Sequence, residues 1–478
     1  MPELPFRPPL PWIQVADGAP CFVTDTGDAW TPIGQNDAIT WPEFAGLFRR
    51  RDPATADRYL AMLAAHGVTV LRLMLEYCHG ENRYLERPAG RMVPHMVRLW
   101  DDLFAACERH GLRILLTPFD TFWTWLRWSK HPYNSANGGP CPCRSQLLTS
   151  RETRKAIKHR LEFASERWGG SGALFAWDLW NEIHSAHAED CATHFTEFIA
   201  DLGGSLREKE IRIHGRSHPQ TVSIFGPHIE SDLCITEAIF RHPQLDFASS
   251  HFYETGTIDH PRDTVAPAIS TGRLTRVALA ETTPMRPFLD SEHGPIHTYK
   301  DHHRTLPEPF DDEYFRHMQW AHFASGGVGG GMRWPNRKPH SLTAGMRRAQ
   351  LALSRFLPLI EWPCFRRRNL NEELIVQSNG IATFGCGDAE QAVVWLLRSD
   401  RIGASGLVEQ GTADGVRLGI PGLLENVFRV SVFDTRCGEL RADFLVQHTG
   451  GGVLHVDVPP FKADIALAVR AVVASWDD

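Results

Sequence analysis

The most informative stretch of the chain is Ala173-Leu174-Phe175-Ala176-Trp177-Asp178-Leu179-Trp180-Asn181-Glu182. Its first eight residues form a short, largely apolar run, which is typical of a buried strand. An amphipathic stretch at residues 151–168 precedes it and indicates a helix. The strand leads directly into Asn181-Glu182, which places an amide and a carboxylate at its carboxyl end. Alternatively, the same pair could cap the next helix, where Asn is favoured.

The same alternation of short apolar runs and amphipathic stretches continues on both sides of this segment. Further strands are predicted at residues 21–23, 30–33, 68–75, 112–118, 221–225 and 245–251, and further helices at 53–65, 92–110 and 343–359. A strand ending near residue 292 and a glycine-rich segment ending at Arg333-Trp334 complete the pattern. Eight strand–helix units over roughly 340 residues predict an α/β fold of the (β/α)8 TIM-barrel type.

The pattern changes after Pro363. Short β-rich runs at residues 373–377, 392–397, 427–433, 453–458 and 465–473 lie between turns rich in Gly, Asp and Asn. No long helical period intervenes, so these residues predict a smaller all-β sandwich. We therefore predict an irregular lead-in at residues 1–20, a barrel at 21–362 and a sandwich at 363–478.

Composition excludes several classes of protein. The 478 residues carry 57 acidic and 50 basic side chains, and a net charge of −7 argues against a nucleic-acid partner. No run of about 18 apolar residues occurs, so no membrane span is predicted. Ten cysteines are too few for a disulfide scaffold, and Cys141-Pro142-Cys143 lacks a second pair to complete a zinc site. We expect no metal and no cofactor, and the sequence carries no indication of an oligomeric state.

The first residues, Met1-Pro2-Glu3-Leu4-Pro5, lack the basic head and apolar middle of a secretory signal. A cytoplasmic location is therefore expected. A secreted protein whose signal has been removed is the alternative.

Tryptophan is frequent, with 15 Trp against 7 Tyr, and such side chains offer flat surfaces on which sugar rings stack. Trp123, Trp125 and Trp128 follow the strand at 112–118 and are mixed with polar residues. We predict that they belong to a sugar-stacking loop, with a helix packing face as the alternative. Asp120 in the same loop is a further candidate substrate contact.

A second carboxylate is expected at the end of the seventh barrel strand. Glu292 ends the run Arg286-Pro287-Phe288-Leu289-Asp290-Ser291-Glu292 and precedes a glycine turn, whereas Glu281 ends Val277-Ala278-Leu279-Ala280. A crossover helix must fit between the sixth and seventh strands, and residues 263–282 supply one before Pro284 ends it. This favours Glu292, and Glu281 is the alternative.

In this order the motifs resemble the retaining glycoside hydrolases of clan A, the cellulase and mannanase superfamily represented by family five. Six segments carry the resemblance: Thr31-Pro32-Ile33-Gly34-Gln35-Asn36 on the first strand, Arg72 on the second, Asn181-Glu182 on the fourth, His251-Phe252-Tyr253 on the sixth, Glu292 on the seventh and Trp334 on the eighth. The likeness covers most of residues 21–360. The segment from Phe119 to Cys143 matches no subfamily, so the resemblance does not indicate the sugar.

The resemblance implies a β-glycosidase that uses two carboxyl groups about 5–5.5 Å apart and no cofactor. Glu182 would be the acid/base and Glu292 the nucleophile. Arg72 and Tyr253 would hold Glu292 ionised, and Asn181 would bind the sugar 2-hydroxyl. His251 and Trp334 occupy family site positions. Arg72, His251 and Trp334 could each instead serve only in folding.

The substrate implied is a β-linked oligo- or polysaccharide of the glucan, mannan or galactan type. Long insertions at residues 82–93, 121–147 and 296–309 favour a short pocket, and the sequence leaves endo and exo action open. Two other classes of protein are alternatives. A metal-dependent amidohydrolase should show His-x-His after its first strand, and none occurs in the chain. A non-catalytic carbohydrate-binding barrel should have lost a glutamate, and both are present.

Overall fold

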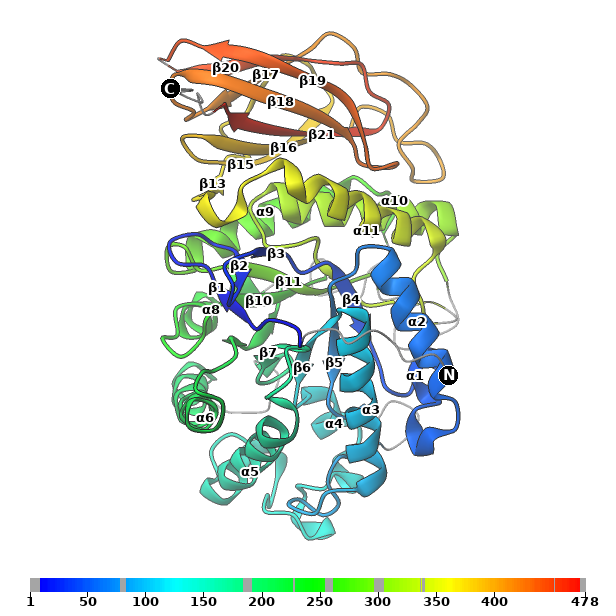
Figure 1. Cartoon of the computed structure of the whole chain (residues 1–478), viewed down its shortest axis with the longest axis vertical. Coiled ribbons are helices and arrows are strands. Elements are labelled where there is room, and N and C mark those ends of the chain that lie inside the picture. Colours follow the sequence, from blue (N-terminus) through cyan, green and yellow to red (C-terminus); the bar gives the residue numbers. More distant parts are fainter. Residues whose placement is uncertain are drawn as a thin grey trace.

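The computed structural model describes residues 9–77, 83–183, 191–226, 228–253, 261–295, 305–335, 337, 340–450 and 452–472. A parallel barrel forms the larger part of the molecule, and a stack of antiparallel strands lies against one side of it (Figure 1). This confirms the predicted fold class.

The barrel has eight strand positions, one of which is occupied by two short strands. They are β4 (Gly34–Asp37), β5 (Val70–Met74), β6 (Arg113–Thr117), β7 (Leu174–Asp178), β8 (Gln220–Thr221) with β9 (Ser223–Phe225), β10 (Ala248–Phe252), β11 (Phe288–His293) and β12 (Met332–Arg333). The hydrogen-bonded order is β8-β7-β6-β5-β4-β12-β11-β10-β9, with parallel neighbours. Because only Val222 separates β8 from β9, the two ends of this sheet meet and the barrel closes.

Helices surround the barrel. Their bounds are α1 (Pro42–Ala45), α2 (Pro53–Ala65), α3 (Pro94–His110), α4 (Thr121–Leu126), α5 (Arg151–Trp168), α6 (Cys191–His214), α7 (His228–Ser231), α8 (Leu233–Phe240), α9 (Ala266–Glu281), α10 (Glu308–Ala324) and α11 (Ala344–Phe356). Local sequence sets several ends: the Ser150 hydroxyl caps α5 by accepting from Thr153 N–H at 3.3 Å, and Gly111 ends α3 with φ of 73°. None of the described helices has the length and apolar character needed to span a membrane.

A small antiparallel sheet closes the amino-terminal end of the barrel. It consists of β1 (Ile13–Val15), β2 (Phe22–Thr24) and β3 (Ala29–Trp30). Phe22 makes edge contacts with Phe175 and Phe247 at ring distances of 4.9 and 5.3 Å, and with Trp30 it joins a core cluster of residues from the barrel strands. The closed base leaves the opposite end of the barrel for a site.

Two predictions near the start of the chain were wrong in detail. Residues 13–15 form a strand although an irregular lead-in was predicted, because three residues carry little local signal and pair with β2 only in the folded chain. The predicted strand 30–33 belongs partly to β3, and the first barrel strand begins at Gly34. A Cβ at Gly34 would lie 1.9 Å from the Val70 carbonyl oxygen, so only glycine allows β4 and β5 to approach here.

The antiparallel part consists of two sheets. The larger has the order β13-β15-β16-β21-β18-β19 and the smaller β14-β17-β20. The bounds are β13 (Arg368–Asn369), β14 (Ile375–Val376), β15 (Ile381–Gly387), β16 (Gln391–Arg398), β17 (Val416–Pro421), β18 (Asn426–Asp434), β19 (Glu439–His448), β20 (Val453–Val458) and β21 (Asp464–Ala471). All five predicted runs overlap a strand, whereas β13, β15, β17 and β19 were not predicted. The domain boundary at residue 363 stays a prediction.

The larger sheet packs on the barrel helices α10 and α11 through an apolar layer that includes Trp320, Phe356 and Phe433 (Figure 1). One buried ion pair crosses this layer. Asp464 on β21 accepts from Arg316 on α10 at 3.1 Å and from Trp395 at 3.0 Å. Burial acts to raise the pKa of Asp464, but Arg316 and the other donors outweigh it and lower the pKa to about 2.

We predict that Asp464→Asn lowers the free energy of unfolding by about 3 kcal/mol at pH 7, because Arg316 loses the closer of its two buried counter-charges and keeps only Glu313 at 3.7 Å. Urea unfolding of the full chain measures this. Asp443→Asn, which removes the exposed pair with Arg429, is the control and should cost less than about 1 kcal/mol.

The pH dependence gives a second readout of the same interaction. Because the folded-state pKa of Asp464 lies below its ordinary value, its contribution is complete above about pH 4 and is lost as the pH falls toward about 2. Equal losses for Asp464→Asn and Asp443→Asn would contradict the assignment.

Candidate active site

The centre of the candidate site is the guanidinium of Arg72, a buried side chain on β5. All five of its N–H groups donate hydrogen bonds. The acceptors are Asp178 at 2.7 and 3.2 Å, Asn181 at 2.6 Å, Asn36 at 2.9 Å and Glu292 at 2.9 Å. One cation therefore contacts side chains of three barrel strands or their ends, β4, β7 and β11.

Asp178 on β7 was missed as a site residue from the sequence. It is fully buried and, besides Arg72, accepts from the backbone N–H and hydroxyl of Ser223 at 3.0 and 3.1 Å and from the Thr117 hydroxyl at 3.3 Å. A carboxylate within an apolar strand requires a buried partner. The available sequence signal was a charged residue within each of two apolar strands: Asp178 in Trp177-Asp178-Leu179 and Arg72 in Leu71-Arg72-Leu73.

Glu182 lies just beyond β7, in a backbone conformation with φ of 50°. Two contacts hold this backbone: its N–H donates to the Ser223 hydroxyl at 3.2 Å, and its carbonyl accepts from the Thr121 hydroxyl at 3.1 Å. The carboxyl group meets Nδ1 of His251 at 2.7 Å. Burial, with a smaller contribution from Asp178, raises the pKa of Glu182 to about 7 against the opposing charge of Arg72. Glu182 can therefore carry a proton near neutral pH.

Glu292 lies on β11 and faces Glu182. Its two oxygens accept from different donors, Tyr253 hydroxyl at 2.5 Å and Arg72 at 2.9 Å. Burial raises the pKa of Glu292, while His251, Arg72 and Tyr253 act to lower it. One oxygen each of Glu182 and Glu292, and a ring nitrogen of His251, lie within 4.8 Å of one another.

His251, on β10, joins the two glutamates. Burial lowers the pKa of His251 to about 4, so the ring is neutral at neutral pH. Its Nδ1 meets Glu182, and its Nε2 has no hydrogen-bond partner among the described residues. The neutral ring can donate a hydrogen bond to Glu182 or accept one from it. Because it carries no charge, it does not favour the ionised form of the Glu182 carboxyl group.

Asn181 and Asp120 form a second layer beside Arg72. The Asn181 side chain accepts from Arg72 through Oδ1 and donates from Nδ2 to Asp120 Oδ1 at 2.7 Å. Asp120 also caps α4 by accepting from Phe122 N–H at 3.2 Å. Burial and the neighbouring glutamates raise the pKa of Asp120 to about 7.

The aromatic residues divide into two groups. Trp334 follows β12 at the mouth of the barrel, is half-buried, and contacts Trp41 and Tyr77 at ring distances of 5.3 and 6.1 Å. Trp123 is only 2% exposed and belongs to the main hydrophobic core, so the prediction that it stacks on sugar was wrong. It lies on α4, whose inward face packs on the barrel.

Two further tryptophans belong to the predicted stacking loop. Trp128 is half-buried and stacks on His131 at 5.6 Å, and the side chain of Trp125 lies outside the described residues. Of the insertions predicted to wall off the site, residues 82 and 296–304 also lie outside them.

Glu281 does not share the site. It ends α9 rather than a strand, and its carboxylate pairs with Arg241 at 3.2 Å. The crossover helix predicted between the sixth and seventh strands is α9, and Glu292 is the glutamate that meets Glu182.

The cluster of Glu182, His251 and Glu292 has the residue types of a metal site. Its hydrogen bonds fit proton transfer better, because Glu292 already accepts from a guanidinium and a hydroxyl. A cation beside Arg72 would also meet a fixed positive charge.

No protein-family model matches this chain, and no curated protein matches it. Solved structures do resemble it. A glycoside hydrolase of 12% identity aligns over 99% of this chain and 100% of its own, with a TM-score of 0.57. A family 5 glycoside hydrolase from Bacteroides vulgatus, also 12% identical, aligns over 98% of this chain and 97% of its own at 0.58. A family 5 mannosidase from Rhizomucor miehei, 13% identical, aligns over 68% of this chain and 86% of its own at 0.50. At these identities the likeness shows the fold.

Proposed function

We propose that this protein is a retaining β-glycosidase that acts on a β-linked oligo- or polysaccharide. The observation that carries the proposal is the pair Glu182 and Glu292, which place one oxygen each within 4.8 Å of the other at the carboxyl-terminal end of the barrel, in different environments. Retaining enzymes need carboxyl groups about 5–5.5 Å apart, and inverting enzymes need about 6.5–9.5 Å to admit a water. The short separation supports retention.

In the first step an oxygen of Glu292 attacks the anomeric carbon and the bond to the leaving oxygen breaks. Glu182 gives its proton to that oxygen, so the leaving group departs as a neutral alcohol. In the second step Glu182, now ionised, takes a proton from water while the water oxygen attacks the anomeric carbon. The bond to Glu292 breaks, Glu182 regains its proton, and the sugar keeps its configuration.

The surrounding side chains support these roles. Arg72 and Tyr253 donate to Glu292 and stabilise its ionised form, which must be present for attack and must re-form as it leaves. Asn181 is oriented by Arg72 and Asp120 and retains an amide hydrogen for the sugar 2-hydroxyl. Asp120 and Trp334 are proposed to contact the sugar, and His251 to orient Glu182.

The likeness to solved glycoside hydrolases supports the class of reaction. Two of these proteins align over nearly the whole chain, including the antiparallel part, and the Rhizomucor miehei protein is a mannosidase. β-Mannosides therefore head the substrates to test, followed by β-glucosides, β-galactosides and their polymers.

Azide tests the two roles separately, on whichever aryl β-glycoside of this panel the wild type hydrolyses best. Glu182→Ala should lower kcat/KM by about 10²–10⁴-fold on substrates with poor leaving groups. The loss should be much smaller on a dinitrophenyl glycoside, whose leaving group needs no acid. Azide should restore turnover and give the β-glycosyl azide. Glu292→Ala should lose on the order of 10⁴–10⁶-fold on all substrates, and azide should give the α-glycosyl azide.

Glu281→Ala is the matched control, since it removes a glutamate that is near Glu292 in sequence but ends α9 and pairs with Arg241, away from the site. Its activity should stay within about twofold of wild type, as for most surface changes. An inactive Glu281→Ala with an active Glu292→Ala would reject the assignment. Full activity in the presence of a chelator separates this proposal from a metal-dependent hydrolase.

The pH profile follows from the pKa of Glu182. Its proton is required for the first step, so kcat/KM should fall about tenfold per pH unit above the pKa of about 7. On the acidic side the rate should fall as Glu292, whose pKa burial raises, becomes protonated. Glu182→Ala assayed on the dinitrophenyl glycoside should lose the alkaline limb, and an unchanged limb would show that another group controls it.

A further inference from the structure

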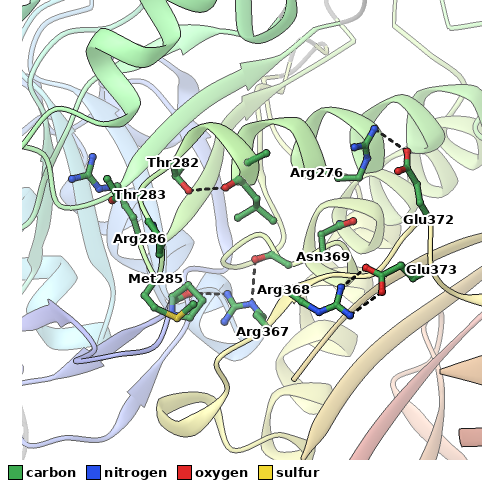
Figure 2. A pocket seen from close by; sticks show the side chains of 15 residues that line it. Arg276, Thr282, Thr283, Met285, Arg286, Arg367, Arg368, Asn369, Glu372 and Glu373 are labelled. Carbon is green, nitrogen blue, oxygen red and sulfur yellow. Dashed lines mark hydrogen bonds and ion pairs between the residues drawn. The ribbon is translucent and has the colours of Figure 1, made fainter. Parts of the chain in front are cut away.

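The two ends of strand β11 have different surroundings. The turn before the strand, residues 282–286, lines a pocket of about 430 Å³ beside the antiparallel part (Figure 2). The last four residues of the strand, from Asp290 to His293, are all buried. Of their ionisable side chains only Glu292 has a role in the proposed reaction. Asp290 and His293 are therefore buried ionisable groups that the reaction does not account for.

The pairing of β11 with β10 contains a bulge next to Glu292. Ser250 pairs with Asp290 and His251 pairs with Glu292, so Ser291 has no partner on β10. Successive side chains of a regular strand point to opposite faces of the sheet. One unpaired residue shifts this alternation by one position, and bulges beside active sites re-aim side chains in this way.

The bulge decides which way Glu292 points. Phe288 packs against aromatic rings of α8 and α10, whereas Leu289 belongs to the core inside the barrel. Regular alternation would therefore place residue 292 on the helix face of the strand, together with Phe288. In the structure Glu292 instead meets Arg72 inside the barrel, and His293 packs against α10.

Asp290 and His293 lie on either side of the bulge and are hydrogen-bonded to each other. Asp290 Oδ2 and His293 Nδ1 are 2.9 Å apart, and both side chains are at most 1% exposed. The main chain of Asp290 is also held, because its N–H donates to Nε2 of His322 on α10 at 3.3 Å. The pair therefore spans the bulge on the helix side of the strand.

Gly331, in the glycine-rich segment before β12, leaves space for this pair. A Cβ at Gly331 would lie 2.7 Å from Asp290 Oδ2 and 3.1 Å from His293 Nδ1, and the φ of this residue is 74°. Both the space and the backbone conformation therefore require glycine. On the barrel side, the Asn36 amide donates to the carbonyl of Ser291 at 2.9 Å. The bulge is thus held from both faces of the strand.

Burial determines the charge of the pair. It raises the pKa of Asp290 well above its ordinary value, against the N–H groups of Phe252 and Glu292, and it lowers the pKa of His293 well below its ordinary value. A protonated carboxyl group and a neutral ring can share a hydrogen bond without a buried charge. Asparagine at position 290 can preserve such a bond, because its amide both donates and accepts.

We propose that the hydrogen bond between Asp290 and His293 holds this bulge and thereby turns Glu292 into the barrel. Asp290 is then a positioning residue, which acts through Glu292 without touching the substrate. Removing the bond lets β11 relax toward regular alternation and moves the Glu292 carboxylate away from Arg72. The importance of this placement for catalysis rests on the proposed function, whereas the placement itself does not.

Two substitutions at position 290 test the effect on the reaction, with the aryl β-glycoside that the wild type hydrolyses best. Asp290→Leu is similar in size but forms no hydrogen bond. It should lower kcat by about 10²-fold and leave KM within about threefold, because a misplaced nucleophile slows attack more than binding. Asp290→Asn keeps the bond, and its kcat should stay within about threefold of wild type.

Two controls separate placement from stability. Arg276→Gln removes an exposed ion pair with Glu372 at 2.9 Å beside the pocket that precedes β11 (Figure 2), and its kcat should stay within about twofold of wild type. Asp464→Asn removes a buried carboxylate outside the site and should also keep the wild-type kcat. If Asp290→Leu does not fold, His293→Phe takes its place, because it removes the same bond and retains an aromatic ring.

Crystal structures of the wild type and the position-290 variants test the placement directly. In Asp290→Leu the Glu292 carboxylate should lose its contacts with Arg72 and Tyr253, and in Asp290→Asn it should keep them. An unmoved Glu292 in Asp290→Leu, or equal losses of kcat in the two variants, would overturn the proposal. The structures do not depend on activity. A wild type that hydrolyses no glycoside would therefore reject the proposed function, and the structures would still decide the placement.

Discussion

The buried guanidinium of Arg72 is the constraint on which the candidate site depends. Its five N–H groups are all taken up by Asn36, Asp178, Asn181 and Glu292. The planar guanidinium fixes the direction as well as the distance of its acceptors. One side chain therefore positions Glu292, Asn181 and Asp178. The positive charge also offsets the cost of burying several carboxyl groups together.

The barrel explains why these residues can meet. Its parallel strands bring their carboxyl ends to one face, so Arg72, Glu182, His251 and Glu292 converge although they are far apart in sequence. The sheet formed by β1, β2 and β3 closes the opposite face with aromatic side chains. The antiparallel part packs on α10 and α11, away from the mouth (Figure 1). The candidate site and the contact between the barrel and the antiparallel part thus lie in different regions of the molecule.

Sequence patterns predicted the architecture well because strand and helix periods are local. Helices at 53–65 and 151–168 have the predicted bounds, and the crossover argument selected Glu292 over Glu281. The predictions that were wrong or missing concern features that tertiary contacts determine. Trp123 was predicted to lie in a sugar-stacking loop, but it lies on α4 and packs in the core. Strand β1 exists only through pairing, and β15 and β19 carry glycine or exposed charges that obscure their alternation. Asp178 could have been found by asking which cation its burial requires.

The most direct test of the central claim is to trap the intermediate. A 2-deoxy-2-fluoro-β-glycosyl fluoride of the best sugar slows both steps and departs without help from an acid, so the glycosyl-enzyme accumulates. Mass spectrometry of the intact chain and then of its peptides should show one added sugar, on the peptide that contains Glu292. Glu281→Ala should label like wild type, and Glu292→Ala should not label. A label on any other residue, or hydrolysis of substrate with inverted configuration at the anomeric carbon, would contradict the account.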